Sequence, residues 1–275
     1  MKENFIPVRF FTAAFAWSWL FWLPLVLVGL GIISLEGDAL TLISVLISVI
    51  GAFGPAFGAY VSIRTIQGKG AFRAFLKPFF SLRFGWKTWA ALFLVLGLST
   101  AAAWIIPEFF GEHRAPMLLP GIFIFPVYWL AMVFLGGGQE EIGWRGYILP
   151  FLEKRFGRIC GSLVLSVIWA CWHIPLWFVP GASQGYMNFF GFLMLTTGYS
   201  FFFAWVLRAS GNRPLSALIA HGTANAFIPV FPVVIMIPGA AQPRFWLWVS
   251  FTLVIGIVTT AAGEISRRRG TASGG

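Results

Sequence analysis

The sequence predicts an all-α integral membrane protein, a polytopic bundle of about eight transmembrane helices. Hydrophobic residues make up 59% of the 275 residues, charged residues make up only 10%, and the mean hydropathy is +0.84. The apolar residues form long continuous runs of about 20, which is the length of a helix that spans a bilayer. Strands of a membrane barrel would instead alternate between apolar and polar residues. We therefore expect residues 1–275 to form a single integral-membrane domain.

Eight apolar runs can be marked out along the chain. The expected spans are residues 10–34, 39–63, 88–106, 118–138, 159–179, 186–207, 214–237 and 245–263. Between the second and third spans, basic residues among Phe, Leu and Trp predict an interfacial amphipathic helix. The last residues, 265–275, are rich in Arg, Gly and Ser, and we expect a disordered tail there.

The charge distribution predicts the orientation. The net charge is +10, and Arg114 and Arg244 are the two exceptions among 19 Lys and Arg that otherwise lie before the first span, after the even-numbered spans or in the tail. The positive-inside rule then places both termini in the cytoplasm of a multi-pass protein, which we expect in the plasma membrane. These basic residues would contact anionic lipid of the bilayer. Because the basic residues lie between apolar segments, the net charge does not indicate nucleic-acid binding, and we expect no nucleic-acid partner.

The fourth span ends in the pair Glu140 and Glu141, with Arg145 four residues beyond the second acid. Carboxylates at the edge of hydrocarbon are costly to desolvate, and ionisable residues in membranes are usually functional. In a helix, Glu141 and Arg145 would share one face, whereas Glu140 would point about 100° away. We interpret the first two as a structural pair and Glu140 as free for chemistry. The alternative is that both acids lie at the surface, balanced by the basic residues that follow.

Two of the three histidines lie inside apolar runs. Trp169 precedes His173 by one helical turn, and Asn225 follows His221 by one turn. Either histidine alone could simply make an interhelical hydrogen bond. However, polar groups in hydrocarbon must find one another or water, so we expect these residues to converge with the glutamates.

Such a cluster is suited to hydrolysis. A carboxylate beside an imidazole can take a proton from water, and a second imidazole with an Asn amide can stabilise an oxyanion. Zinc on Glu140, His173 and His221 is the alternative, because His and Glu are suitable ligands. HExxH is absent and the two histidines lie on different predicted helices, so we expect no cofactor.

The motifs EExxxR (Glu140, Glu141, Arg145), aromatic-xxxH (Trp169, His173) and HxxxN (His221, Asn225) follow one another on successive predicted helices. In this order they resemble the CPBP family of intramembrane glutamic endopeptidases, which includes CAAX prenyl protease 2 and bacteriocin-processing or self-immunity proteins. The resemblance covers roughly residues 118–229, which we take as the catalytic core.

The resemblance implies a role for each matching residue. Glu140 would be the general base that activates water, aided by His173, and the oxyanion site would consist of His221 and Asn225. Glu141 and Arg145 would support this geometry. The family commonly has Phe where this chain has Trp169, whose larger ring would narrow the substrate channel.

We therefore expect a membrane-embedded endopeptidase that cleaves a membrane-associated or lipidated protein or peptide near the cytoplasmic leaflet. The alternatives are a non-catalytic immunity or scaffold protein of the same fold, and a proton-coupled transporter. To bring the site to one depth, we expect the fourth span to continue past Gly138. We also expect residues 147–158 to form an interfacial elbow, with span five starting well after Arg158 and Arg145 reaching the surface.

Overall fold

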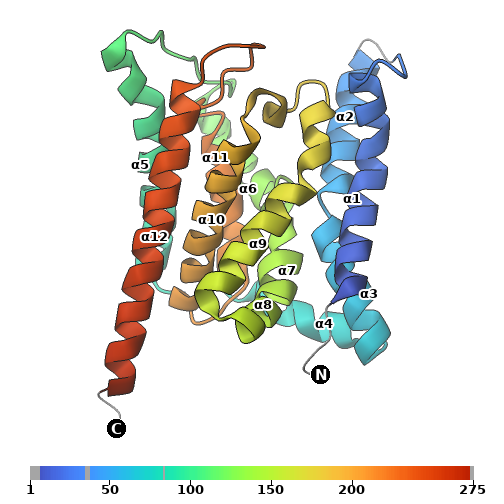
Figure 1. Ribbon diagram of the computed structural model, residues 1–275, viewed down its shortest axis with the longest axis vertical. Helices are drawn as coiled ribbons and strands as arrows, with labels where there is room; N and C mark the ends of the chain where they lie inside the picture. The colour runs from blue at the N-terminus through green and yellow to red at the C-terminus, as the bar shows by residue number, and fades with distance from the viewer. Residues whose placement is uncertain (1–6, 35–37, 83, 273–275) are drawn as a thin grey trace.

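The computed structural model describes residues 7–34, 38–82 and 84–272, and all regular elements within these ranges are helical. Seven helical segments of the described chain are long and apolar enough to cross a membrane. They stand side by side in one bundle (Figure 1). The predicted polytopic helical membrane fold is thus confirmed.

The helices are α1 (Val8–Gly29), α2 (Asp38–Gly51), α3 (Gly54–Gln67), α4 (Ala71–Leu76), α5 (Trp86–Ile105), α6 (Phe125–Phe134), α7 (Glu141–Gly143), α8 (Leu149–Phe156), α9 (Arg158–Trp172), α10 (Phe189–Ala209), α11 (Leu215–Phe227) and α12 (Pro243–Ala272). Single-turn segments join or extend them: η1 (Lys77–Phe80), η2 (Ile106–Phe110), η3 (Ile122–Ile124), η4 (Gly138–Glu140), η5 (Trp144–Ile148), η6 (Ile174–Phe178) and η7 (Ser183–Tyr186).

Three elements differ from the sequence expectation. The predicted second span is broken between α2 and α3, and Pro55 occupies the first turn of α3, where its missing N–H is tolerated. The predicted seventh span contains only the 13-residue helix α11, followed by irregular chain, so it is too short to cross a bilayer as a helix. Helix α12 continues to Ala272, so most of the tail expected to be disordered is helical.

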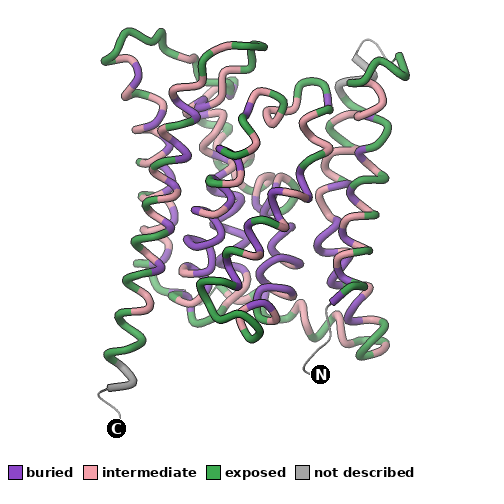
Figure 2. Tube along the Cα trace, viewed as in Figure 1, coloured by how far each residue is buried: buried purple, intermediate pink, exposed green. Residues whose placement is uncertain are grey.

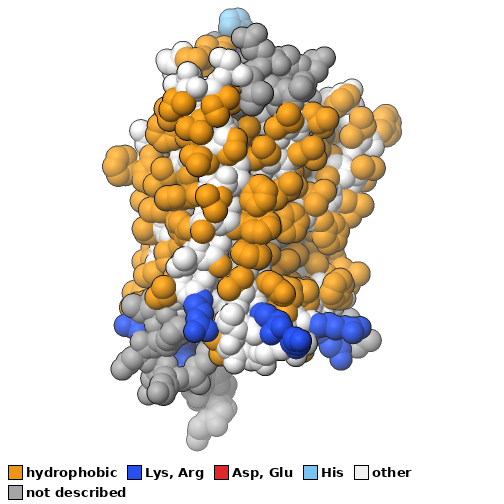
Figure 3. All heavy atoms as spheres, turned by 90° about the vertical axis from the view of Figure 1, so that its right-hand side faces the viewer, with side chains coloured by type: hydrophobic (Ala, Val, Ile, Leu, Met, Phe, Trp, Pro, Cys, Tyr) orange, Lys and Arg blue, Asp and Glu red, His pale blue; other side chains and the backbone are white. Residues whose placement is uncertain are grey.

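The described part of the chain begins and ends at the same end of the bundle. The start of α1, the α8–α9 turn and the end of α12 all lie at the bottom of Figure 1. Lys and Arg side chains form a band at this end, below a broad hydrophobic surface (Figure 3). We call this the basic end. Its placement in the cytoplasm stays a prediction.

Helices α10 and α11 form the centre of the bundle. Of the most apolar window of α10, 72% is buried, against 22% for α1, and most of α11 is buried as well. The outer faces of the peripheral helices are exposed (Figure 2), and their exposed side chains are largely hydrophobic. This is the arrangement expected for a bundle surrounded by lipid, in which polar residues are confined to the interior.

Helices α10 and α12 approach each other through small residues. A Cβ on Gly198 would lie 2.5 Å from the carbonyl oxygen of Thr252, and a Cβ on Gly256 would overlap the backbone of Gly198. Such contact between glycines brings two membrane helices close enough for extensive van der Waals contact. It fixes α10, and hence the residues that α10 contributes to the interior.

We expect Gly256→Ala to lower the stability of the folded protein by about 1–3 kcal/mol, because the added methyl group forces the two backbones apart. Gly263→Ala, on the same helix, is the matched control, since its Cβ would lie an ordinary 3.4 Å from Trp205. Thermal unfolding in detergent measures both. Equal melting temperatures for the two variants would contradict the close approach.

Candidate active site

The paired glutamates lie inside the membrane-spanning part of the chain. The apolar helical segment runs from Ile122 to Phe156, so the expectation that span four continues past Gly138 is confirmed. Helix α9 begins at Arg158 itself, and Arg145 is only 1% exposed. The predicted late start of span five is therefore wrong. The predicted surface position of Arg145 is also wrong, because Arg145 finds its counter-charge, Glu141, inside the bundle.

The backbone around the glutamates is not a regular α-helix. Gly137, with φ +127°, precedes the 3₁₀ turn η4, and the π-helical turn η5 follows α7. Only glycine adopts this φ readily. A Cβ at Gly137 would also overlap the Asn225 amide and lie 2.7 Å from His221 Nε2. Glycine thus lets the backbone touch the polar site, and a π-turn is a frequent feature of functional sites.

Glu141 connects two helices through a buried ionic network. Its Oε2 accepts a hydrogen bond from Arg145, and its Oε1 lies 2.9 Å from His221 Nδ1. The Glu141 and Arg145 side chains have no exposure, so the predicted structural pair is present. A carboxylate accepts hydrogen bonds, so Nδ1 of His221 carries the proton and Nε2 is turned toward Gly137. Glu141 therefore also orients a candidate catalytic histidine.

Glu140 faces a different helix from Glu141. The residue is 4% exposed, and its Oε2 accepts a hydrogen bond of 2.8 Å from the indole nitrogen of Trp169. The two adjacent acids thus make separate contacts, one with α9 and the other with Arg145 and α11. This separation agrees with our interpretation of Glu140 as the residue available for chemistry.

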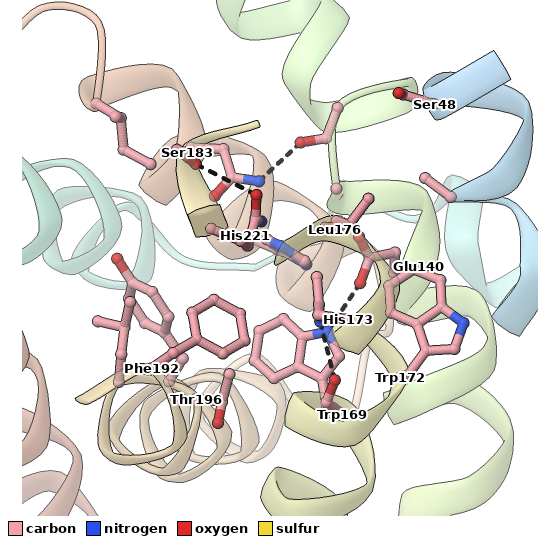
Figure 4. A pocket seen from close by; sticks show the side chains of 18 of the residues that line it. Ser48, Glu140, Trp169, Trp172, His173, Leu176, Ser183, Phe192, Thr196 and His221 are labelled. Atoms are coloured by element: carbon pink, nitrogen blue, oxygen red, sulfur yellow. Dashed lines mark hydrogen bonds between the residues drawn. The ribbon is translucent and has the colours of Figure 1, made fainter. Parts of the chain in front are cut away.

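His173 closes the C-terminal end of α9. Its Nδ1 lies 2.8 Å from the carbonyl oxygen of Trp169. Because a carbonyl can only accept, Nδ1 is the protonated nitrogen and Nε2 has a free lone pair in the neutral ring. The ring is held edge-on between Trp172 and Phe192, at centroid distances of 4.7 and 5.1 Å. This arrangement leaves a fixed hydrogen-bond acceptor in the cavity that Glu140 also lines (Figure 4).

Asn225 lies on α11, one turn beyond His221. Its amide nitrogen donates a hydrogen bond of 2.7 Å to the carbonyl oxygen of Gly136. An amide nitrogen carries two hydrogens, so one N–H remains for a ligand. Asn225 is half-buried and therefore accessible from the cavity that it lines.

The four predicted catalytic residues line one cavity of about 290 Å³ (Figure 4). Its wall is mainly apolar and aromatic, with Trp22, Trp172, Phe192 and Trp248 among the residues. The other polar residues that line it are Ser48, Ser183, Gln184, Thr196 and Tyr199. The sequence prediction that these residues converge thus agrees with the structure.

The cavity extends away from the basic end. Above α7, the helix that follows Glu140 in Figure 1, its walls include Ser183 and Gln184. These two residues are half-buried in the segment between η6 and α10, at the top of the view. In the opposite direction, the chain after Glu140 contributes the buried side chains of Trp144, Ile148 and Leu152. Access to Glu140 is therefore from the end opposite the basic residues.

The donor set offers little for a metal ion. Within the described residues, no group of three or more His, Cys, Asp or Glu side chains is placed to hold one. One nitrogen of each candidate histidine is already hydrogen-bonded, as is one oxygen of Glu140. We keep the expectation of no cofactor as a prediction for solution measurements.

Two contacts escaped sequence reasoning. Glu141 and His221 are 80 residues apart and no spacing rule joins them. The hydrogen bond from Trp169 to Glu140 was also missed, although a signal existed. An indole N–H within hydrocarbon needs an acceptor, and the nearest predicted helices offered few.

Fold and site together define a class: a polytopic membrane protein with a Glu/His/His/Asn cluster in a cavity within the bundle. Residues 122–227 match the family model described as type II CAAX prenyl endopeptidase Rce1-like. This segment contains all seven residues of the three motifs, and the match confirms the predicted resemblance to the CPBP family. The chain is also similar to CAAX prenyl protease 2 of Methanococcus maripaludis, with 26% identity over 146 residues. The match covers 52% of this chain and 54% of that protein, about half of each.

We expect Arg145→Met to lower stability by about 3–5 kcal/mol, because it leaves the Glu141 carboxylate buried without its guanidinium partner. Arg158→Met is the matched control: Arg158 pairs with Glu264 at 3.5 Å, and its side chain is 42% exposed. That change should cost about 1 kcal/mol or less. Thermal unfolding in detergent compares them, and similar losses would show that the buried pair is unimportant.

Proposed function

We propose that this protein is a membrane-embedded endopeptidase that hydrolyses a peptide bond with water activated by Glu140 and His173. The observation that carries the proposal is the convergence of Glu140, His173, His221 and Asn225 on one cavity, within the segment that matches the endopeptidase family model. Each residue supplies a group that amide hydrolysis requires.

The first step is attack by water. Trp169 occupies Oε2 of Glu140, and Oε1 remains to accept a proton from a water molecule. His173 Nε2 can accept the second hydrogen bond of that water and so fix its orientation. As Glu140 takes the proton, the water oxygen forms a bond to the carbonyl carbon of the substrate. The carbonyl oxygen becomes an oxyanion.

The second step is breakdown of the tetrahedral intermediate. The free N–H of Asn225 would donate to the oxyanion, and His221 Nε2 would do so when the ring carries both protons. Glu141 accepts the hydrogen bond from Nδ1 and so fixes the orientation of the ring. When the carbon–nitrogen bond breaks, Glu140 returns its proton to the leaving amine, so atoms and charge balance. No step requires a metal.

We propose a membrane-associated or lipidated protein or peptide as substrate, in the plasma membrane. The cavity supports this class because its wall is rich in aromatic and aliphatic side chains and it opens within a lipid-facing bundle. The similar protein from Methanococcus maripaludis bears the name of a CAAX prenyl protease, which points to a prenylated chain end as the first substrate to try.

Two other functions are compatible with some of these residues. A proton-coupled transporter needs a polar path to both ends of the bundle, and the buried residues that follow Glu140 favour a site open to one end. A non-catalytic immunity or scaffold protein would not need an oriented Glu/His/His/Asn set, although such a protein could retain one.

Purified protein in detergent with EDTA should cleave members of a fluorogenic peptide library that includes a farnesylated CAAX peptide. We expect Glu140→Gln to reduce kcat by about 10²–10⁴-fold, because the proton acceptor is lost. We expect Asn225→Ala to reduce it by about 10²–10³-fold. Glu153→Gln is the control, since Glu153 pairs with Arg208 outside the cavity. Activity that is lost in EDTA and restored by zinc would overturn the metal-free mechanism. A complete lack of cleavage would favour the scaffold function.

The side of the membrane from which substrate enters is linked to topology. The cavity extends away from the basic end, whereas the positive-inside rule places that end in the cytoplasm. Cytoplasmic termini and cleavage near the cytoplasmic leaflet therefore do not fit this structure together. We give more weight to the charge distribution, because 16 of the 19 basic residues follow it even when the buried Arg145 is left out of the 17 counted from the sequence.

Single cysteines decide the orientation. In a Cys160→Ser, Cys171→Ala background, we expect Ser183→Cys, at the cavity, to react with a membrane-impermeant maleimide in intact cells. Lys154→Cys, at the basic end, should react only after permeabilisation. The reverse pattern would place the cavity on the cytoplasmic side and show that this protein departs from the positive-inside rule.

A further inference from the structure

We propose that Trp169 is the positioning residue of the general base: its indole N–H aims the Glu140 carboxylate and favours the ionised form. This inference rests on the proposed function and adds a role that an aromatic ring alone does not provide. The juxtaposition that carries it is the 2.8 Å hydrogen bond from Trp169 Nε1 to Glu140 Oε2.

Trp169 contacts four other residues of the site: Glu140, His173, His221 and Arg145. Besides its bond to Glu140, its carbonyl oxygen binds His173 Nδ1 at 2.8 Å. Its ring lies 5.1 Å from the ring of His221, edge-on, and 5.4 Å from the Arg145 guanidinium. The residue is 3% exposed. The side chain of Trp169 thus lies between the glutamate segment and α11, while its backbone carbonyl orients His173.

The N–H group is the part of this side chain that matters for Glu140. A hydrogen-bond acceptor stabilises a buried indole N–H, and Glu140 Oε2 provides one. In return, a hydrogen bond donated to a carboxylate stabilises its charged form, which is the form that accepts a proton from water. Phenylalanine at this position would keep the aromatic wall but could donate no hydrogen bond.

Other charged or titratable groups also face this part of the cavity. Glu141 and Arg145 lie on the same segment as Glu140, His173 lies on α9, Tyr199 on α10 and His221 on α11. Of these, Arg145 and Glu141 neutralise each other in a direct pair. Trp169, by contrast, donates its hydrogen bond directly to the Glu140 carboxylate. Removal of that hydrogen bond should therefore change the orientation and ionisation of Glu140 more than those of the other groups.

The kinetic test compares Trp169→Phe with Trp104→Phe. Both substitutions remove an indole hydrogen bond of 2.8 Å, but Trp104 donates to the carbonyl of Ala115, away from the cavity. For Trp169→Phe we expect kcat to fall by about 10- to 100-fold, with KM changed about twofold or less, since one charge-assisted hydrogen bond is lost. The acid limb of the pH–activity profile should move to higher pH. Trp104→Phe should leave both the kinetic constants and the profile unchanged.

A second measurement does not depend on finding a substrate. In ¹⁵N-labelled protein, the indole signal that Trp169→Phe removes identifies Trp169. Glu140→Gln should shift that signal strongly, because the acceptor loses its charge, and should leave the Trp104 signal in place. This result supports the hydrogen bond even if no peptide is cleaved.

The outcomes separate the two proposals. An unshifted Trp169 signal in Glu140→Gln, or a Trp169→Phe enzyme with unchanged kcat and pH profile, would overturn the positioning role. If KM rises while kcat is unchanged, Trp169 is instead only part of the substrate wall. If no substrate is cleaved but the indole signal shifts, the contact stands and the proposed peptidase function is what fails.

Discussion

The organisation of this protein depends on a charged network inside the bundle, in which Glu141 is held between Arg145 and His221. A buried ion pair adds little net stability, because desolvation offsets the attraction between its charges. The loss of either partner is nevertheless expensive, so every alternative packing that separates them is disfavoured. The network therefore selects one arrangement of the fourth span against α11. It also turns His221 so that the nitrogen not bound to Glu141 faces the cavity.

A regular α-helix without glycine at position 137 could not form that arrangement. Gly137 brings the backbone of the fourth span against Asn225 and His221, where any side chain would collide. The 3₁₀ and π turns on either side of α7 place two successive carboxylates against different partners. Backbone irregularity at membrane depth is tolerated when it is buried in protein. Here it places two adjacent acids in different surroundings: Glu141 in the ionic network with Arg145 and His221, and Glu140 at the cavity.

The sequence was sufficient to predict the features that depend on helical spacing or on the cost of burying polar groups. Glu141 and Arg145 lie one helical turn apart, and the cost of isolated polar groups in hydrocarbon was enough to predict that His173, His221 and Asn225 would join the glutamates. The depth of the site residues in the membrane was harder to predict, because the rise per residue of a helix does not reveal that α9 starts at Arg158 or that the fourth span is irregular. The same limitation hid the shortness of α11. Pairs such as Glu141–His221 result from packing between distant segments, and spacing within one segment contains no information about them.

The shape of the cavity bears on the chemistry as much as its residues do. Hydrolysis inside a bilayer needs a supply of water and a barrier that keeps the site from becoming a proton leak. Hydrogen-bonding groups along the open part of the cavity come from Ser48, Ser183 and Gln184. Beyond Glu140, toward the basic end, the buried side chains of Trp144 and Ile148 fill the interior of the bundle. A proton relay would require polar groups that continue past Glu140 to the basic end. The buried pair Glu141 and Arg145 follows Glu140, but beyond it this segment contributes the apolar side chains of Ile148 and Leu152. A cavity that is open at one end and sealed at the other suits a hydrolase, whereas a transporter must open to each end in turn. Here the sealed end is formed by the same segment that carries Glu140, the proposed general base.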